Sequence, residues 1–195
     1  RHNFHTFSPL LYQVATSGLE PSEVAYPVRA IFRNKGNVRI LLGEVQTIDR
    51  AAKTVTVAYD STQRVERYDY LIVAAGSKTH YFGLDQIETH GFELKDLADA
   101  VVLRNHTLKL FEYAAWADDL ALRQALTTVV IVGGGPTGLE MAGALYELYV
   151  HVLHNEFAKQ LGDFKGRVIL VEMQDHLLQP YPKRLQAAAR RQLEN

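Results

Sequence analysis

Apolar residues along this chain follow two different periods, and these predict both strands and helices. Alternating apolar positions at 38–45 and 55–59, separated by a polar turn at 49–53, predict an antiparallel β-hairpin. The run 68–76 is apolar throughout its second half, which is typical of a strand buried on both faces of a sheet. Apolar spacings of three and four residues predict helices. The expected helices span residues 8–16, 21–35, 96–117, 139–153 and 183–194.

Individual residues add detail to the helical pattern. Pro27 predicts a kink or break in the second helix, because proline removes an N–H donor and clashes with the preceding turn. Asp96 is the expected N-cap of the third helix, and Asp118-Asp119 its end. Residues 81–93 follow neither period and are expected to form a loop.

A glycine-rich turn separates a β-rich run from the fourth helix. The run is 128–132, and the turn is Gly133-Gly134-Gly135-Pro136-Thr137-Gly138. Gly133, Gly135 and Gly138 fit the G-x-G-x-x-G spacing of a dinucleotide-binding turn. In that motif they permit a sharp bend, the approach of a pyrophosphate and close helix packing. Pro136 and Thr137 fall in the first helical turn, where free N–H groups and the positive dipole end would hold the phosphates.

An acidic residue at the end of the next β-rich run supports this interpretation. Glu172 follows the run 167–171, where a carboxylate can bind the ribose hydroxyls of a nicotinamide dinucleotide. Glu172 lies 34 residues after Gly138, against roughly 20 in the usual motif. Residues 155–166 are expected to form an inserted turn that accounts for the excess. That segment includes Gly162, Asp163 and Gly166.

Glu140 has two interpretations that the sequence leaves open. It lies two residues after Gly138, near the expected path of a bound dinucleotide. Its carboxylate is either favoured by the helix dipole or is an acid close to the nicotinamide.

Composition narrows the function classes. The net charge of −1 gives no overall electrostatic case for nucleic-acid binding. The absence of cysteine excludes disulfides, thiolate metal sites and cysteine nucleophiles. The histidine pairs at 2 and 5 and at 151 and 154 have no well-spaced third ligand, so no metal site is expected. No apolar run approaches the length of a membrane span.

Six motifs in a fixed order resemble the type II NADH dehydrogenases, which are single-chain NADH:quinone oxidoreductases. They lie at 8–15, 21–27, 41–45, 68–76, 132–143 and 168–172. The resemblance implies an α/β fold with parts of two Rossmann-like dinucleotide-binding domains and an antiparallel β-hairpin segment. Residues 1–90 would belong to the FAD-binding domain, and residues 91–195 to the inserted NADH-binding domain.

The resemblance also implies an activity in the respiratory chain. A hydride would pass from NADH to bound FAD, and two electrons would then pass to a membrane quinone without proton pumping. Glu140 would lie near the nicotinamide and the flavin as a catalytic residue. Glu172 would bind the adenosine ribose and disfavour NADPH. The residues implied to line the FAD site are Ser8, Pro9, Leu10, Val45, Ala75 and Gly76.

The same resemblance carries expectations about partners and location. It implies peripheral association with the cytoplasmic inner face of the plasma membrane, through a part outside residues 1–195, and is compatible with a homodimer. The family's first FAD glycine turn and its quinone site are also expected outside these residues. Two alternatives stay open: another FAD-dependent reductase, such as a ferredoxin or rubredoxin reductase, and a non-catalytic NADH-binding module.

Overall fold

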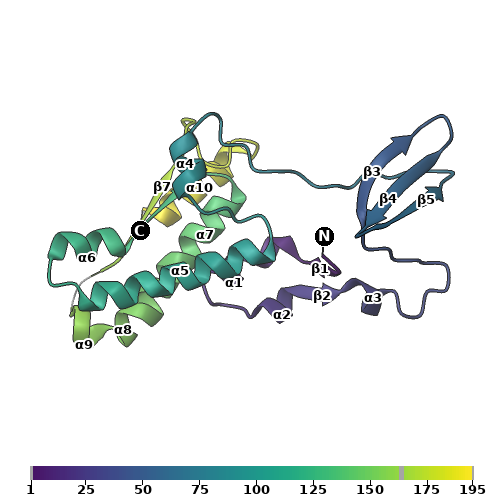
Figure 1. Ribbon diagram of the computed structural model, residues 1–195. Coiled ribbons are helices and arrows are strands. Elements are labelled where there is room, and N and C mark those ends of the chain that lie inside the picture. Colours follow the sequence, from purple (N-terminus) through teal and green to yellow (C-terminus); the bar gives the residue numbers. More distant parts are fainter. Residues whose placement is uncertain (1, 163–164, 195) are drawn as a thin grey trace. The chain divides into compact units, whose positions relative to one another are not determined.

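The computed structural model describes residues 2–162 and 165–194, and its chain divides into two compact units (Figure 1). Unit 1 comprises Arg1–Thr6 and Ala25–His80, and unit 2 comprises Phe7–Val24 and Tyr81–Asn195. This division follows contacts within the chain and does not identify ligand-binding domains. The assignment of residues 1–90 to FAD and 91–195 to NADH stays a prediction.

Unit 1 is built from antiparallel strands. Strand β1 (Phe4–Thr6) pairs with β2 (Ala25–Pro27), which is followed by the one-turn helix α3 (Val28–Ile31). A three-stranded sheet has the order β3-β4-β5. Its strands are β3 (Glu44–Asp49), β4 (Thr54–Tyr59) and β5 (Thr62–Arg67). The hairpin predicted around the polar turn at 49–53 is therefore confirmed, and a third strand extends it.

Two local predictions in this part of the chain were wrong. Residues 38–43 form no strand, and β3 begins only at Glu44. The run 68–76 is not a buried strand: it has no strand pairing, and Tyr70 and Ile72 are 94% and 89% exposed. A strand needs hydrogen-bonding neighbours, and no segment among the described residues supplies a ladder to this run. The break predicted at Pro27 is present: β2 ends at Pro27 between two short helices, so the expected helix 21–35 is not continuous.

Helices α1 (Leu11–Ala15), α5 (Leu97–Trp116), α7 (Pro136–Glu147) and η2 (Leu148–Leu153) of unit 2 contribute most of one apolar core. The long helix α5 starts at Asp96, whose side chain forms a capping box with Asp99. Helix α6 (Leu120–Leu126) starts at Asp119. The N-cap at Asp96 and the end of α5 before Asp118-Asp119 agree with the sequence. The segment 81–93, expected to be a loop, contains α4 (Asp85–His90).

The N-terminal segment of unit 2 packs directly on α5. It contains the 3-10 turn η1 (Ser8–Leu10), α1 (Leu11–Ala15) and α2 (Pro21–Val24). Val14 and Ala15 of α1 are completely buried, as are Ala100 and Ala114 of α5. Because alanine carries only a methyl group, it allows the two helices to approach closely. Apolar packing therefore fixes this segment.

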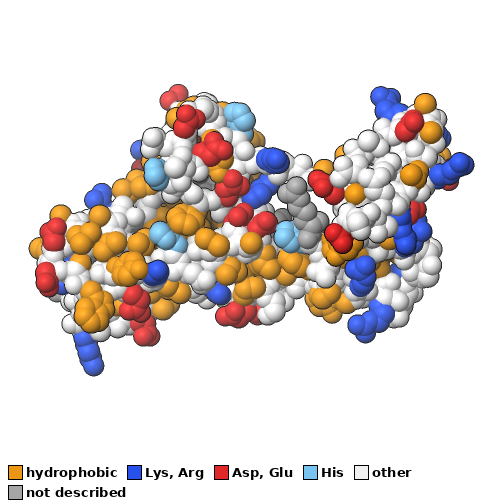
Figure 2. Space-filling view, viewed as in Figure 1, with side chains coloured by type: hydrophobic (Ala, Val, Ile, Leu, Met, Phe, Trp, Pro, Cys, Tyr) orange, Lys and Arg blue, Asp and Glu red, His pale blue; other side chains and the backbone are white. Residues whose placement is uncertain are grey.

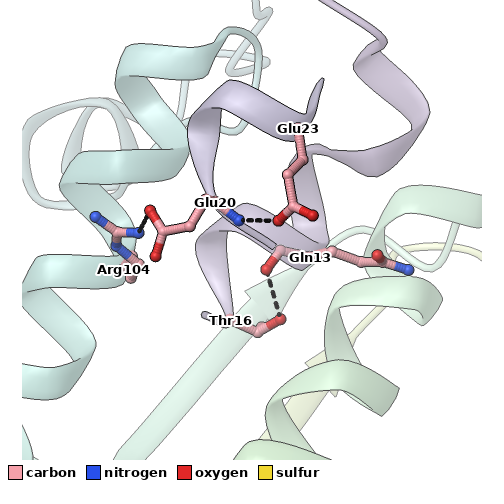
Figure 3. A network of polar contacts seen from close by, with 5 residues as sticks. All are labelled: Gln13, Thr16, Glu20, Glu23 and Arg104. Atoms are coloured by element: carbon pink, nitrogen blue, oxygen red, sulfur yellow. Dashed lines mark hydrogen bonds and ion pairs between the residues drawn. The ribbon is translucent and has the colours of Figure 1, made fainter. Parts of the chain in front are cut away.

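Polar contacts around the same segment are mostly exposed (Figure 3). Arg104 of α5 lies 3.6 Å from the Glu20 carboxylate, whose side chain is 74% exposed. The Glu20 N–H donates to the Glu23 carboxylate at 2.8 Å, and the Thr16 hydroxyl donates to the Tyr12 carbonyl at 2.9 Å. An ion pair this exposed contributes about 1 kcal/mol or less. The network orients the segment, and the core supplies most of its stability.

The last part of unit 2 is a strand–helix–strand unit followed by another helix. Strands β6 (Thr128–Val132) and β7 (Arg167–Val171) are parallel, with Thr128 opposite Arg167 and Val132 opposite Val171. The connection contains α7 (Pro136–Glu147), the π-helical turn η2 (Leu148–Leu153), α8 (His154–Glu156) and α9 (Ala158–Leu161). Helix α10 (Lys183–Leu193) follows β7.

The excess residues between Gly138 and Glu172 are largely helical, so the prediction of an inserted turn at 155–166 was wrong up to Leu161. Apolar contacts explain the difference: Tyr149, Leu153 and Leu161 are buried in the same core as Phe111. Asp163 lies outside the described residues. None of the helices within residues 2–162 and 165–194 is both long enough and apolar enough to cross a bilayer.

Acidic and basic side chains are interspersed with apolar ones on the visible face of unit 2 (Figure 2). This mixture agrees with the net charge of −1. That face carries no extended patch of a single sign.

Candidate dinucleotide site

The glycine turn continues directly from the parallel strands. The Gly133 N–H donates to the Val171 carbonyl at 2.8 Å, which extends the β6–β7 ladder by one bond. Gly133 has a φ of +118°, a backbone conformation that L side chains rarely adopt. The strand therefore ends in a bend that requires glycine.

Gly138 allows the start of α7 to contact this bend. A Cβ atom built on Gly138 would lie 1.9 Å from the Gly133 carbonyl oxygen. Both partners in that clash belong to the backbone, so a side-chain movement could not relieve it. The close helix packing expected of the third glycine in the motif is present.

Gly135 is the N-cap of α7 and faces open space. Its φ and ψ of −77° and −178° are extended values that any residue can adopt. A Cβ atom built there would meet no heavy atom within 4 Å. Packing within the protein therefore does not require glycine here, whereas the approach of a pyrophosphate would. Pro136 and Thr137 are exposed in the adjoining first turn.

The carboxylate of Glu172 is fixed by two backbone donors. Its Oε2 accepts from the Gly134 N–H at 2.6 Å, and its Oε1 accepts from the Gln174 N–H at 2.9 Å. These bonds, the one from Gln174 foremost, lower the pKa of Glu172 below the ordinary value of 4.5. A carboxylate has about four lone-pair positions, so two remain for ribose hydroxyls.

The sequence motif did not reveal the contact between Gly134 and Glu172. The Gly134 N–H holds Glu172, and a Cβ atom there would lie 2.6 Å from Cδ2 of Leu177 and 3.1 Å from Cβ of Glu172. The motif permits any residue between its first two glycines. The only available signal was the run of three successive glycines.

Glu140 lies just beyond the first turn of α7 and is exposed. Among the described residues its side chain makes no hydrogen bond or ion pair. The dipole effect falls off within the first helical turn, so the dipole gives little reason for a carboxylate here. Its role near the nicotinamide stays a prediction.

The residues assigned to FAD are divided between the two units. Ser8 and Pro9 are exposed and Leu10 is half-buried, all in η1 of unit 2. Val45 is an exposed residue of β3 in unit 1, and the exposed pair Ala75-Gly76 lies in an extended segment of that unit. Their shared role in flavin binding stays a prediction.

Two further features of unit 2 lie apart from the glycine turn. A cavity of about 700 Å³ is lined by parts of α7, β7, the following loop at 174–177 and α10, but by no residue of the turn itself. His151 and His154 lie in η2 and α8. Within residues 2–162 and 165–194, no group of three or more His, Cys, Asp or Glu side chains could hold a metal ion.

Comparison with known families and proteins gives consistent matches. The family described as pyridine nucleotide-disulphide oxidoreductase matches residues 1–195. The type II NADH:quinone oxidoreductase NdhA of Mycobacterium tuberculosis is 43% identical over 190 residues, which cover 97% of this chain and 40% of NdhA. The Ndh protein of the same organism is 41% identical, over 98% of this chain and 42% of Ndh.

Solved structures agree at the level of the fold. The structure of NDH2 from Plasmodium falciparum in complex with NADH superimposes with a TM-score of 0.86 at 22% identity, covering 100% of this chain and 40% of that one. The chain thus spans about 40% of the length of these relatives.

Proposed function

Because the chain belongs to the pyridine nucleotide-disulphide oxidoreductase family, we propose that the whole protein is an FAD-dependent NADH:quinone oxidoreductase. The observation that carries this proposal is the glycine turn with Glu172 held against it by Gly134. The names of the two mycobacterial relatives support quinone as the electron acceptor.

The residues of unit 2 have distinct tasks in binding NADH. The free N–H groups at the start of α7 hold the pyrophosphate, which approaches over Gly135. The two unused lone-pair positions of Glu172 accept from the adenosine ribose hydroxyls. The negative charge of Glu172 repels the 2′-phosphate of NADPH.

Bound FAD would accept the hydride from NADH and supply the two-electron chemistry. Residues 1–90 would contribute to its site, with Ser8, Pro9, Leu10, Val45, Ala75 and Gly76 as contacts, and residues 91–195 would bind NADH. Glu140 would stand close to the nicotinamide. The whole protein would act as a peripheral protein on the cytoplasmic inner face of the plasma membrane, in a form compatible with a homodimer.

Purification of the whole protein tests this function directly. We expect flavin absorbance in the visible range and oxidation of NADH that depends on an added quinone. A colourless protein that binds NADH without turnover would instead indicate the non-catalytic module. Turnover with ferredoxin or rubredoxin but not with quinone would contradict the choice of acceptor.

Changing Glu172→Gln should narrow the preference for NADH over NADPH. Glutamine keeps an acceptor for one backbone N–H but removes the charge that repels the 2′-phosphate. We expect the ratio of the two dissociation constants to fall about tenfold, equivalent to about 1.4 kcal/mol. Glu147→Gln, which removes an exposed charge at the far end of α7, is the matched control. An unchanged ratio would show that Glu172 is not the ribose ligand.

The same experiment has a defined pH dependence. Because the pKa of Glu172 is lowered, its carboxylate is ionised above 4.5, and its contribution to stability is lost only as pH falls through the lower folded value. A phosphate monoester gains a proton near pH 6. At pH 5 the 2′-phosphate of NADPH carries less negative charge than at pH 7, so Glu172 should repel it less and the preference for NADH should weaken. In Glu172→Gln, which lacks the repelling charge, the preference should change less with pH.

A further inference from the structure

Leu178 holds a strained backbone conformation in the loop that follows β7. Its φ is +53°, in the left-handed region that a non-glycine residue occupies only at an energetic cost. Such a conformation persists when surrounding contacts enforce it. The contacts around Leu178 therefore indicate what the loop is built to do.

Gln186 of α10 holds the loop from one side. Its side-chain amide donates to the Tyr181 carbonyl at 2.9 Å and lies 3.3 Å and 3.4 Å from the carbonyl oxygens of Gln179 and Leu178. The Tyr181 N–H also donates to the Leu178 carbonyl at 2.8 Å. Gln186 is half-buried; its contact with the Leu178 carbonyl is partly buried, and those with Gln179 and Tyr181 are exposed. One side chain thus binds three successive parts of the turn.

The other side of the loop contacts the glycine turn. The Leu178 N–H donates to the Gly134 carbonyl at 2.9 Å, and the Leu177 side chain packs on the Gly134 backbone. The N–H of Gly134 in turn donates to Glu172. Contacts therefore run without interruption from Gln186 through Leu178 and Gly134 to the carboxylate.

We propose that Gln186 is a positioning residue that sets the preference for NADH over NADPH. It holds the 177–181 loop against Gly134 and thereby fixes the Glu172 carboxylate. The inference rests on the proposed function, since it assigns Gln186 to the same nucleotide site. Gln186 itself acts from α10, through the loop.

Gln186→Met tests this in the whole protein, because methionine keeps the length and neutrality of the side chain and removes its donors. We expect NADH to bind about threefold to tenfold more weakly, the effect of losing one hydrogen bond. NADPH should change less than twofold, so the preference should narrow. Gln192→Met, an exposed position on the same helix, is the matched control. An equal loss for both nucleotides would overturn the proposal, because it would show general destabilisation.

A double variant shows whether Gln186 acts through Glu172. In the Glu172→Gln background, Gln186→Met should leave the NADH/NADPH ratio unchanged, because the charge that it positions is already gone. Independent effects on the ratio would contradict the proposal.

Amide hydrogen exchange without nucleotide separates this inference from the proposed function. The amides of Leu178 and Gly134 should exchange faster in Gln186→Met than in the wild type. Unchanged exchange would overturn the positioning role even if NADH binds. Failure of the wild type to bind NADH would overturn the proposed function, whatever the exchange rates.

Discussion

Gly138→Ala should destabilise unit 2 by about 3 kcal/mol or more, although it adds a single methyl group. The new Cβ atom would lie 1.9 Å from the Gly133 carbonyl oxygen, so the start of α7 and the end of β6 would have to separate. Loss of this packing should lower the thermal unfolding midpoint and expose the segment 128–147 to proteolysis.

Gly143→Ala on the same helix is the control with the opposite expectation. A Cβ atom at Gly143 meets nothing within 4 Å, and alanine in a helix interior is more stable than glycine by roughly 0.5–1 kcal/mol. The midpoint should therefore stay or rise. If the unfolding midpoint of Gly138→Ala stays within about one degree of the wild type, α7 can shift without cost. That result would contradict the close packing of Gly138 on Gly133.

Gly135→Leu should abolish NADH binding while leaving the fold intact. The backbone at Gly135 suits any residue, and its Cβ direction is free of protein atoms. A leucine side chain would occupy the space through which the pyrophosphate reaches the N–H groups of α7. Losing charge-assisted hydrogen bonds worth about 1.5–3 kcal/mol each should weaken binding at least about 100-fold.

Gly135→Ser provides a graded comparison for this variant. Serine is a favourable N-cap, so stability should be retained or improved, while its small side chain obstructs the ligand less than leucine does. Calorimetric titration with NADH, together with the unfolding midpoint, separates the two effects. Full NADH affinity in a folded Gly135→Leu protein would refute the position of the site.

Gly138 and Gly135 therefore have different roles in the same motif. Gly138 is required by contacts inside the protein, whereas a Cβ atom at Gly135 meets no heavy atom within 4 Å, so only the proposed ligand would require glycine there. The first variant should fail in folding, and the second should fail in binding. The spacing of the glycines alone does not distinguish these roles.

Local signals in the sequence were reliable where nearby residues determine the structure. Asp96 caps α5 through a bond to a residue three positions away, and the polar turn at 49–53 joins two adjacent strands. The glycine turn and Glu172 were predicted for the same reason: each follows its own strand. The resemblance to type II NADH dehydrogenases is confirmed by the mycobacterial relatives.

Predictions failed where distant contacts decide the outcome. The apolar run 68–76 has the composition of a buried strand but no paired neighbour among the described residues. The role of Gly134 depends on a carboxylate 38 residues away. The strain at Leu178 and the amide of Gln186 that holds its turn have no signature in the local sequence.

The hydrogen bond between Gly134 and Glu172 also limits how the coenzyme preference could evolve. Gly134 is buried, so losing the acceptor of its N–H would cost about 1–3 kcal/mol. A lineage that replaced Glu172 with an arginine to accept NADPH would lose stability in the same mutational step. Adaptation to NADPH would therefore require a prior or simultaneous compensating substitution near the turn, and selection for a folded protein alone would help to retain the acidic residue.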